Sequence, residues 1–231
     1  GNNLSTLNIT GLLNLVNLRC YNCNLTSLNL INLPNLKSLH CYANNLTTIN
    51  LSSLTKLEQL ICDNNRLTTL DLSNLSNLNE IRCWNNQLES LNLKNGKIES
   101  TITIFNNPNL RFICCDEEQL DYIQSQVLQY GINNCSVNSY CSFTPGGTYY
   151  NISGTTKFDS NNNGCDASDI NYSNLNFSIT DGTNAGSLIA NQTGNYNIPV
   201  SAGNHTITPN LENPTYFNIY PTSFTVDFPT Q

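Results

Sequence analysis

The sequence has no methionine, one tryptophan, two histidines and few charged side chains, and each shortage limits what the protein can be. Only 11% of its 231 residues are charged, with nine Lys and Arg against 16 Asp and Glu, which gives a net charge of −7. This charge argues against a partner made of phosphates, so nucleic acid is not expected as a ligand. The chain also lacks an apolar run near the roughly 18 residues that cross a bilayer, so we expect no membrane insertion.

The few charges that are present divide the chain into two regions. Residues 1–111 hold eight basic and six acidic side chains, whereas residues 112–231 hold one basic and ten acidic side chains. The composition also changes near Ser142, where Thr, Asn, Gly and aromatic residues become frequent. These differences predict two domains, residues 1–141 and residues 142–231.

A repeat of 21 residues runs through the first region. Its unit reads LxxLxCxxNxLxxLxLxxLxx, and one complete copy extends from Leu36 to Lys56. Each Leu-x-Cys predicts a short strand with two inward side chains, and strands of successive units are expected to stack about 4.8 Å apart in a parallel sheet. The cysteines that recur at this spacing are Cys20, Cys41, Cys62 and Cys83.

An asparagine follows the strand in each unit, three residues after the cysteine or the residue in its place. Its amide is expected to satisfy backbone groups that the turn out of the strand leaves unpaired. The second half of each unit, LxxLxL, echoes the first half, which favours extended or turn-like coils over helices. The asparagines of this predicted ladder are Asn44, Asn65, Asn86 and Asn107.

Over residues 4–115 this pattern resembles the 21-residue leucine-rich repeats of bacteria. The resemblance implies a mainly β fold built as a solenoid. Residues 4–12 match the second half of a unit whose first half is absent, so we expect further repeats or a cap upstream in the parent protein. Residues 116–131 begin with acidic side chains and continue with apolar residues at helical spacing, which predicts an amphipathic helix that caps the last coil.

The second region has the alternating texture of β-strands separated by Gly- and Asn-rich turns. Its segments GTTKFDSNNNG and TGNYNIPVSAGNHTITP resemble the Ig-like, prealbumin-like or Cna-B-type β-sandwich modules of bacterial surface proteins. His205 takes the place of the last tyrosine of that pattern. Seven strands are predicted, at residues 149–158, 175–180, 187–190, 196–200, 205–209, 216–219 and 224–228.

Residues 159–169 repeat the opening of a calcium loop. Oxygen ligands at positions 1, 3 and 5 converge when a glycine at position 6 allows a sharp turn, and Gly164 holds that position. No glutamate stands at position 12, where Ile170 lies, and a solvated Asn-rich turn is the alternative interpretation. The predicted structural Ca²⁺ ligands are Asp159, Asn161, Asn163, the backbone of Cys165, and Asp169 with Asp166 as a second choice.

The ten cysteines divide by their register in the repeat. Cys20-x-x-Cys23 has the spacing of a redox or zinc motif, but the period of 21 explains it better, because Cys23 occupies a position of the asparagine ladder. Outside the core, a disulfide between Cys141 and Cys165 is expected to pin the calcium-like loop. Cys135 is expected to pair with either Cys114 or Cys115, and disulfides would be consistent with export.

Nothing in the sequence assembles a catalytic site. His40 and His205 lie in different predicted domains, so a Ser-His-Asp or Cys-His arrangement lacks support. The adjacent Glu117 and Glu118 are explained by the electrostatics of a helix N-terminus. We therefore expect a protein that is not an enzyme.

Two columns of outward side chains on the stacked strands are the strongest candidate for a binding surface. Aromatic rings and cationic groups lie side by side there, and Tyr, Trp and Arg are enriched at binding hot spots. The alternative interpretation is that the rings only pack against one another and strengthen the stack. The column before each cysteine is Arg19, His40, Ile61, Arg82 and then Thr103, and the column after it is Tyr21, Tyr42, Asp63, Trp84 and then Phe105.

Four segments together resemble one family: the Cys-containing repeats, NNPNLRFICCDEEQL, NCSVNSYC and TKFDSNNNGCDASD. That family is the multidomain surface proteins of gliding Bacteroidota exported by the type IX secretion system. The resemblance implies a location at the cell surface or in the medium, and a segment of a larger protein that serves adhesion. The implied partners are the type IX machinery during export, an extracellular glycan or surface protein, and gliding adhesins.

Two other functions fit the same residues. The chain can be a passive spacer or export cargo whose repeats only extend a distal domain, or an accessory domain of a secreted hydrolase. A spacer predicts that changing Arg82 and Trp84 leaves adhesion intact in a folded protein.

Overall fold

The computed structural model describes residues 3–4, 6–143 and 145–229. The chain forms two compact units, Gly1–Cys135 and Ser136–Gln231, which we call the repeat unit and the β unit. The division falls earlier than the boundary expected after Cys141. No helix in the described part of the chain is long and apolar enough to span a membrane.

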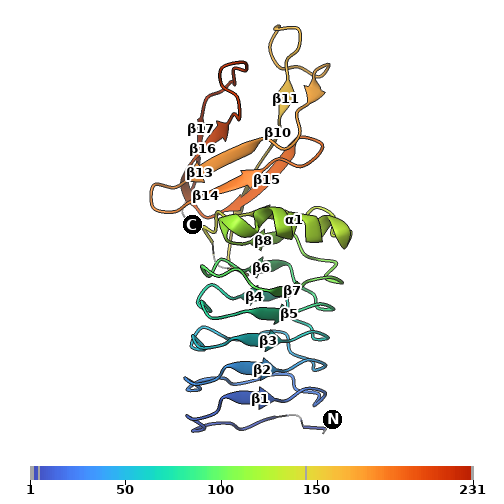
Figure 1. Ribbon diagram of the computed structural model, residues 1–231, viewed down its shortest axis with the longest axis vertical. Coiled ribbons are helices and arrows are strands. Elements are labelled where there is room, and N and C mark those ends of the chain that lie inside the picture. The colour runs from blue at the N-terminus through green and yellow to red at the C-terminus, as the bar shows by residue number, and fades with distance from the viewer. Residues whose placement is uncertain (1–2, 5, 144, 230–231) are drawn as a thin grey trace. The chain divides into compact units, whose positions relative to one another are not determined.

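The repeat unit is a stack of coils that follow one another in chain order, from β1 in blue to β8 in green (Figure 1). One strand of each coil contributes to a parallel sheet in the order β1-β2-β3-β5-β7. The strands pair in register, so that Leu18, Leu39 and Leu60 form one buried column that Ile81 and Ile102 continue. The strands are β1 (Asn17–Arg19), β2 (Ser38–His40), β3 (Gln59–Ile61), β5 (Glu80–Arg82) and β7 (Thr101–Thr103).

The other half of each repeat also becomes extended in the C-terminal coils. A second parallel set pairs there in register, with Leu70, Leu91 and Ile113 as its buried central residues. In the described residues, the nested LxxLxL sequences therefore give strands or turns and no helix, as predicted. These strands are β4 (Thr69–Asp71), β6 (Ser90–Asn92) and β8 (Phe112–Cys114).

The asparagine ladder forms as predicted. Asn86 Nδ2 donates to the carbonyl oxygens of Cys62 and Cys83 at 3.2 and 3.1 Å, and Asn86 Oδ1 accepts the amide of Leu67 at 2.9 Å. One side chain thus satisfies backbone groups of two neighbouring coils, which a buried backbone requires. The equivalent bonds are made by Asn44, Asn65 and Asn107.

A second, partly exposed asparagine ladder was not predicted. Asn85 Nδ2 donates to Asn64 Oδ1 at 2.6 Å, and Asn106 Nδ2 donates to Asn85 Oδ1 at 2.6 Å. All three residues have a positive φ, between 54° and 56°, which asparagine tolerates better than most residues. The signal was present in the sequence, because an asparagine stands two residues after Cys62 and Cys83.

The helix after the last coil is shorter than the predicted 116–131. A 3₁₀ turn, η1 (Glu117–Gln119), leads into α1 (Leu120–Gln129), which buries Leu120, Ile123 and Val127. Asp116 does not cap this helix through its side chain. Its Oδ2 instead accepts the amides of Asn95 and Gly96 at 3.2 and 2.9 Å, so the acid closes the preceding coil.

The β unit is built of antiparallel strands. Its larger sheet has the order β17-β16-β13-β14-β9, and β10 pairs with β15 and β11 with β12. Residues of both sheets share one buried core, including Phe177 and Leu188 from the larger sheet and Ile152 and Ile198 from the β10–β15 pair. The strands are β9 (Ser136–Asn138), β10 (Tyr150–Thr155), β11 (Lys157–Phe158), β12 (Ile170–Asn171), β13 (Asn176–Thr180), β14 (Ala185–Ile189), β15 (Asn195–Val200), β16 (Gly203–Asn210) and β17 (Phe224–Phe228).

Six of the seven predicted strands are present, and the strand predicted at residues 216–219 is wrong. That segment follows a turn in which the amides of Tyr216 and Phe217 both donate to the carbonyl of Asn213. Pro214 favours this turn because its ring fixes φ. Alternating aromatic residues here do not mark a buried face, since Tyr216 is 80% exposed. Strands β9 and β12 are too short to have been read from alternation.

Candidate functional site

The outward side chains of β1, β2, β3, β5 and β7, with the residue two positions after each strand, form what we call the strand face. The pairing register places the predicted columns as expected, so Arg19, His40 and Ile61 are neighbours on successive strands, with Arg82 on β5. The second column stays in register too, since the amide of Asn22 bonds to the Tyr42 carbonyl and later coils repeat this bond. The sheet therefore holds both columns on one rigid surface.

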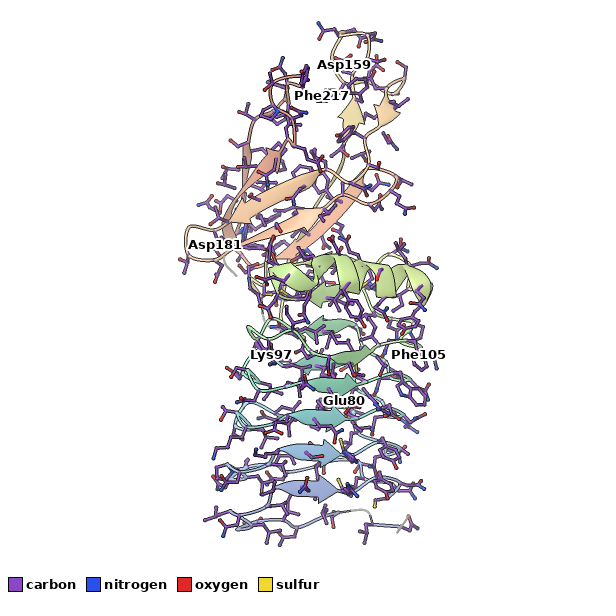
Figure 2. The ribbon with its side chains drawn as sticks, viewed as in Figure 1. Glu80, Lys97, Phe105, Asp159, Asp181 and Phe217 are labelled. Atoms are coloured by element: carbon purple, nitrogen blue, oxygen red, sulfur yellow. The ribbon has the colours of Figure 1, made fainter. Side chains whose placement is uncertain are left out.

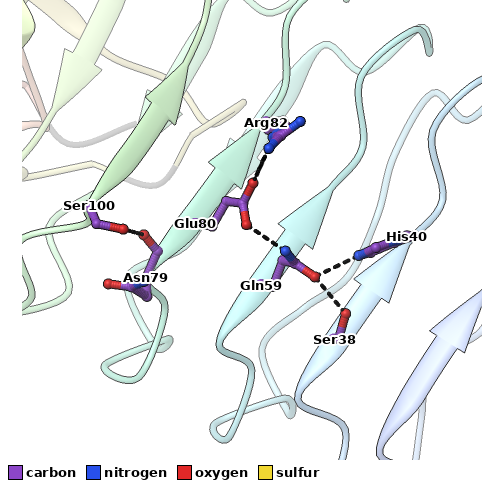
Figure 3. A network of polar contacts seen from close by, with 7 residues as sticks. All are labelled: Ser38, His40, Gln59, Asn79, Glu80, Arg82 and Ser100. Atoms are coloured by element: carbon purple, nitrogen blue, oxygen red, sulfur yellow. Dashed lines mark hydrogen bonds and ion pairs between the residues drawn. The ribbon is translucent and has the colours of Figure 1, made fainter.

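Hydrogen bonds link polar side chains across three of these strands (Figure 3). Gln59 Oε1 on β3 lies 2.8 Å from Ser38 Oγ and 2.6 Å from His40 Nε2, both on β2. Gln59 Nε2 donates to Glu80 Oε2 at 2.5 Å, and the Arg82 guanidinium donates to Glu80 Oε1 from two nitrogens at 2.6 Å. Because an amide oxygen only accepts, His40 carries its proton on Nε2.

Glu80 is the centre of this network. Partial burial raises the pKa of Glu80, but the hydrogen bonds from Gln59 and Arg82 and the charge of Arg82 outweigh burial and hold it below its ordinary value. Glu80 is therefore a carboxylate at neutral pH, and it fixes the exposed Arg82 in one orientation. Sequence reasoning missed Ser38, Gln59 and Glu80, which occupy the first position of each strand, although their polar character was visible.

The aromatic rings of the second column form two stacked pairs, in the order predicted from the sequence. Tyr21 stacks on Tyr42 with ring centroids 4.5 Å apart and planes 7° apart, and Trp84 stacks on Phe105 at 5.1 Å and 11°. Between the two pairs the column holds Asp63. Figure 2 shows Phe105 at one margin of the coils, with Glu80 on the strands and Lys97 at the opposite margin.

Asp63 is almost fully covered, with 5% of its surface exposed. Its Oδ2 accepts a hydrogen bond from Asn64 Nδ2 at 2.7 Å. Burial raises the pKa of Asp63, although this bond and the charge of Arg82 oppose the shift. The residue is thus a partly desolvated acceptor between two aromatic pairs.

The cysteines that the repeat register predicts to point inward are all core residues, including Cys115, which is fully buried. Cys41, Cys62 and Cys83 are fully buried and Cys20 is 5% exposed. Burial raises the pKa of Cys20 to about 11 and that of Cys83 to about 12, so these thiols stay protonated. Cys23 Sγ lies 3.2 Å from the Tyr21 carbonyl oxygen and takes a place in the repeat, as its register predicted.

The predicted disulfides are wrong. Cys165 is an exposed thiol, and Cys115 is a buried one, so neither the bond from Cys141 to Cys165 nor the bond from Cys135 to Cys115 forms. Among the described cysteines, Cys114 and Cys141 are disulfide-bonded. Residue spacing could not select the correct cysteine of the Cys114-Cys115 pair. Cys115 points into the core in register with the repeat, which leaves its neighbour Cys114 for the bond.

In the calcium-like loop, side-chain oxygens accept hydrogen bonds from backbone amides of the same loop. Asp159 accepts the amides of Asn163 and Gly164 at 3.3 and 2.8 Å, and Asn161 Oδ1 accepts the same Asn163 amide at 3.1 Å. Nearby, Lys157 Nζ donates to the carbonyl oxygens of Asp166 and Asp169 at 2.6 and 3.2 Å.

The acids of this loop are not gathered around one point. Asp169 Oδ2 accepts the Asp166 amide at 2.8 Å, and Asp166 Oδ1 accepts from Ser168. Within the described residues, no group of three or more His, Cys, Asp and Glu side chains is placed to hold a metal ion. A bound calcium ion would have to exchange these bonds for its own, and calcium here stays a prediction.

The two histidines have separate structural partners. His40 belongs to the polar network of the strand face. His205 is fully buried in the β unit, where its Nε2 donates to the Ser201 carbonyl at 2.9 Å and its Nδ1 lies 2.8 Å from the Tyr140 hydroxyl. His205 therefore fills the place of the tyrosine in the Cna-B-type pattern as a hydrogen-bonded core residue.

The repeating 21-residue coils, their parallel strands and the asparagine ladder together decide the fold class. The repeat unit is a leucine-rich-repeat-like solenoid, with parallel strands stacked from coil to coil. No protein-family model matches the chain, and no curated protein matches it. Among solved structures, the functional domain of InlJ from Listeria monocytogenes, which includes a cysteine ladder, is similar with 18% identity and a TM-score of 0.41. The match covers 99% of this chain and 60% of that one, so the chain spans about three fifths of its length.

Proposed function

We propose that this chain is a non-enzymatic binding module whose strand face recognises an extracellular glycan or a surface protein. The observation that supports this most is the register of aromatic, cationic and polar side chains on five successive coils. A leucine-rich-repeat core requires only the inward residues, so the outward Arg82 and Trp84 are not needed for the core. Residues of these types dominate binding energies where they are held in place.

The polar network supports recognition in a second way. A flexible arginine loses side-chain entropy when it binds a partner, which costs roughly 0.5–1.5 kcal/mol. The two-nitrogen contact of Arg82 with Glu80, and the bond from Gln59 to Glu80, restrict this side chain before any partner arrives. The strand face is therefore preorganised for binding.

A passive spacer is the competing function, since the stacked rings also strengthen the coils. The test is the double substitution Arg82→Ala with Trp84→Ala, assayed for binding to immobilised cell-surface extract and to extracellular polysaccharides. A matched control, Arg111→Ala with Tyr122→Ala, removes an exposed cation and an exposed aromatic from elsewhere in the repeat unit. We expect the first pair to abolish saturable binding and the control to retain it. Binding retained in both folded variants would favour the spacer.

Several finer assignments remain proposals that rest on sequence resemblance. These are a Cna-B- or prealbumin-like sandwich for the β unit, a capping role for α1, and a place at the cell surface or in the medium as part of a type IX cargo. A role in adhesion, with gliding adhesins as partners, is a further proposal based on the same resemblance. Fractionation of cells with and without a functional type IX system, probed with antibody to this chain, tests the export route. Retention of the chain inside export-deficient cells is the expected result.

We also propose that residues 159–169 bind one structural calcium ion. The spacing of Asp159, Asn161 and Asn163 supports it, together with the positive φ of Gly164, 95°, which permits the sharp turn. We expect weak binding, because an ion must displace the bonds of Lys157 and of the loop backbone. Millimolar CaCl₂ should raise the unfolding midpoint of the full chain, with no rise for Asp159→Ala and a normal rise for Asp181→Ala. If CaCl₂ does not raise the unfolding midpoint of the unmodified chain, the loop is a plain turn that binds no calcium.

A further inference from the structure

Exposed apolar side chains from two separate segments meet at one end of the β unit. Phe158 on β11 pairs directly with Ile170 on β12, and cross-strand partners point to the same face of a hairpin. The ring of Phe217 approaches Phe158 edge-on, with centroids 6.2 Å apart. Ile170 is 67% exposed, and Tyr216, the chain neighbour of Phe217, is 80% exposed. We call Phe158, Ile170, Tyr216 and Phe217 the apolar tip, and Figure 2 labels Phe217 at this end of the unit.

The outer face of the larger sheet has the opposite character. Ser178 on β13 pairs with Thr208 on β16, and Thr206 lies on the same face two residues earlier. The alternate residues Ile179 and Ile207 point the other way, into the buried core. The sequence thus places polar side chains where this sheet meets water and apolar ones at the tip. Exposed apolar side chains that cluster in this way mark an interaction surface.

Acidic residues accompany the apolar tip along the chain. Asp159 directly follows Phe158, and Asp166 lies four residues before Ile170. Hydrogen bonds from Ser168 hold the pKa of the exposed Asp166 below its ordinary value, so Asp166 is a carboxylate at neutral pH.

This negative charge is not balanced within the β unit. Residues Ser136–Gln231 include six acidic side chains and one basic side chain, Lys157. Lys157 Nζ donates to the backbone carbonyls of Asp166 and Asp169, at 2.6 and 3.2 Å. Among the residues that the structure describes, the ion pairs lie in the repeat unit, between Lys37 and Glu58 and between Arg82 and Glu80. The tip is therefore apolar with a net negative surrounding.

This combination of apolar and acidic side chains distinguishes between partners. A second copy of the chain that docked through the same tip would bring like charges together, which opposes association. An anionic polysaccharide or lipid surface would be repelled in the same way. A neutral sugar makes no use of the charge. A basic protein segment fits both features, because Lys and Arg bind carboxylates and aromatic faces, while its apolar side chains cover Ile170.

We propose that the apolar tip of the β unit is a docking surface for a protein segment that carries Lys or Arg beside apolar side chains. This surface is separate from the strand face, so the proposal gives the chain a second binding surface. A calcium ion bound at residues 159–169 would compensate the same acids. The experiment is therefore made in EDTA, where calcium cannot mask the charge.

The test measures fluorescence anisotropy of three labelled peptides of equal length as the full chain is added. One peptide repeats Lys-Leu-Gly, the second has Glu in place of Lys, and the third has Ser in place of Leu. We expect saturable binding of the first peptide and binding weaker by about tenfold or more for the other two. No saturable binding of the first peptide, or equal binding of either of the others, would overturn the proposal.

Unlabelled competitors test the other classes of partner. Laminarin and phosphatidylcholine vesicles should leave the Lys-Leu-Gly peptide bound. Displacement by laminarin would assign the tip to a sugar, and displacement by the vesicles would assign it to a lipid surface. Either result would overturn the proposal.

The decisive variant is Ile170→Ser with Tyr216→Ser, which removes the two most exposed side chains of the tip. We expect it to weaken the Lys-Leu-Gly peptide by about tenfold or more, because both apolar contacts are lost. The matched control is Leu128→Ser with Tyr122→Ser, an exposed aliphatic and an exposed aromatic residue of α1. The control should bind within about twofold of the unmodified chain, and equal binding by both variants would overturn the proposal.

A second variant tests the charge without removing an apolar contact. Asp166→Asn keeps the shape of the side chain and should weaken the peptide by about threefold or more at low salt. Asp227→Asn, an exposed acid on β17, is its control and should change binding little. If circular dichroism shows that the Ile170 and Tyr216 variant is unfolded, the comparison of Asp166→Asn with Asp227→Asn decides the proposal.

The strand-face variant separates this inference from the proposed function. Arg82→Ala with Trp84→Ala should bind the Lys-Leu-Gly peptide as well as the unmodified chain does. Loss of peptide binding in that variant, with binding retained in Ile170→Ser with Tyr216→Ser, would assign the peptide to the strand face and overturn this inference. The proposed function would remain in that case.

Discussion

The two units reach a buried core by opposite routes. In the repeat unit, residues 21 positions apart meet again and again, as in the bonds from Asn85 to Asn64 and from Lys37 to Glu58. In the β unit, contacts join residues that no period relates, such as Tyr140 and His205, 65 positions apart. Sequence periodicity is therefore a map of tertiary contacts in the first unit and gives no such map in the second. The same difference decides where single substitutions should do the most damage.

Removing one member of the buried asparagine ladder should have the largest effect. Asn86→Ala leaves the carbonyls of Cys62 and Cys83 and the amide of Leu67 without their side-chain partner. Each unsatisfied buried group costs roughly 1–3 kcal/mol, so we expect a loss of about 3 kcal/mol or more in the free energy of unfolding. Urea denaturation followed by Trp84 fluorescence measures it. Asn77→Ala is the control, because Asn77 makes one exposed bond, and it should cost less than about 1 kcal/mol.

In the β unit the corresponding loss should come from a single unrepeated pair. Tyr140→Phe removes the hydroxyl at His205 Nδ1 and leaves that buried nitrogen without its donor. We expect the free energy of unfolding to fall by about 1–2 kcal/mol. Hydrogen exchange of β13 and β16 should speed up while β2 and β3 are unchanged. Tyr216→Phe, at an exposed turn, should change neither; equal acceleration in both variants would show that the Tyr140 hydroxyl does not matter.

The partly exposed asparagine ladder offers a way to make the repeat more regular. Ala43 has a φ of 54° at the position where later units carry Asn64 and Asn85. Alanine is strained in this region, and asparagine is less so. Ala43→Asn should therefore raise the free energy of unfolding by about 0.5–1 kcal/mol, measured by urea denaturation. Ala43→Val should lower it, and a gain from both would contradict the conformational explanation.

A small pH effect is expected in the β unit. Partial burial acts to raise the pKa of Asp181, but hydrogen bonds from Asn184 and the Thr183 amide hold it at about 2, below its ordinary 3.8. A depressed acid pKa stabilises the fold above pH 3.8, and this stabilisation is lost as the pH falls toward 2. Because Asp181 is partly exposed, the effect should be modest. Asp181→Asn should show a shallower loss of stability than the unmodified chain between pH 4 and 2, and parallel curves would disprove this.

The strand face illustrates how far sequence reasoning reaches. Register alone placed Arg19, His40 and Arg82 in one column, because a strict 21-residue period fixes which residues are neighbours. It could not show that Glu80 holds Arg82, since that bond depends on side-chain rotamers. It also placed Asp63 between Tyr42 and Trp84 in the second column, but it did not show that the rings on each side stack in pairs.

The cysteines also show what the sequence could and could not predict. Their inward positions followed from the period, which is a property of the sequence. The disulfide partners did not, because Cys114 and Cys115 are adjacent and only the direction of each side chain in β8 and after it distinguishes them. The predicted strand at residues 216–219 failed for a related reason, since alternation resembles a strand whether or not a partner strand exists.

The sequence by itself determined the solenoid, its inward leucines and cysteines, and its buried asparagines. In a repeat, the neighbour of each residue is its own equivalent in the next coil, so local pattern and tertiary contact are the same information. Only the tertiary structure decided how the aromatic rings pair, which polar side chains join across strands, and how Tyr140 meets His205. Those contacts depend on rotamers and on chain crossings between distant residues, and no short-range pattern encodes either.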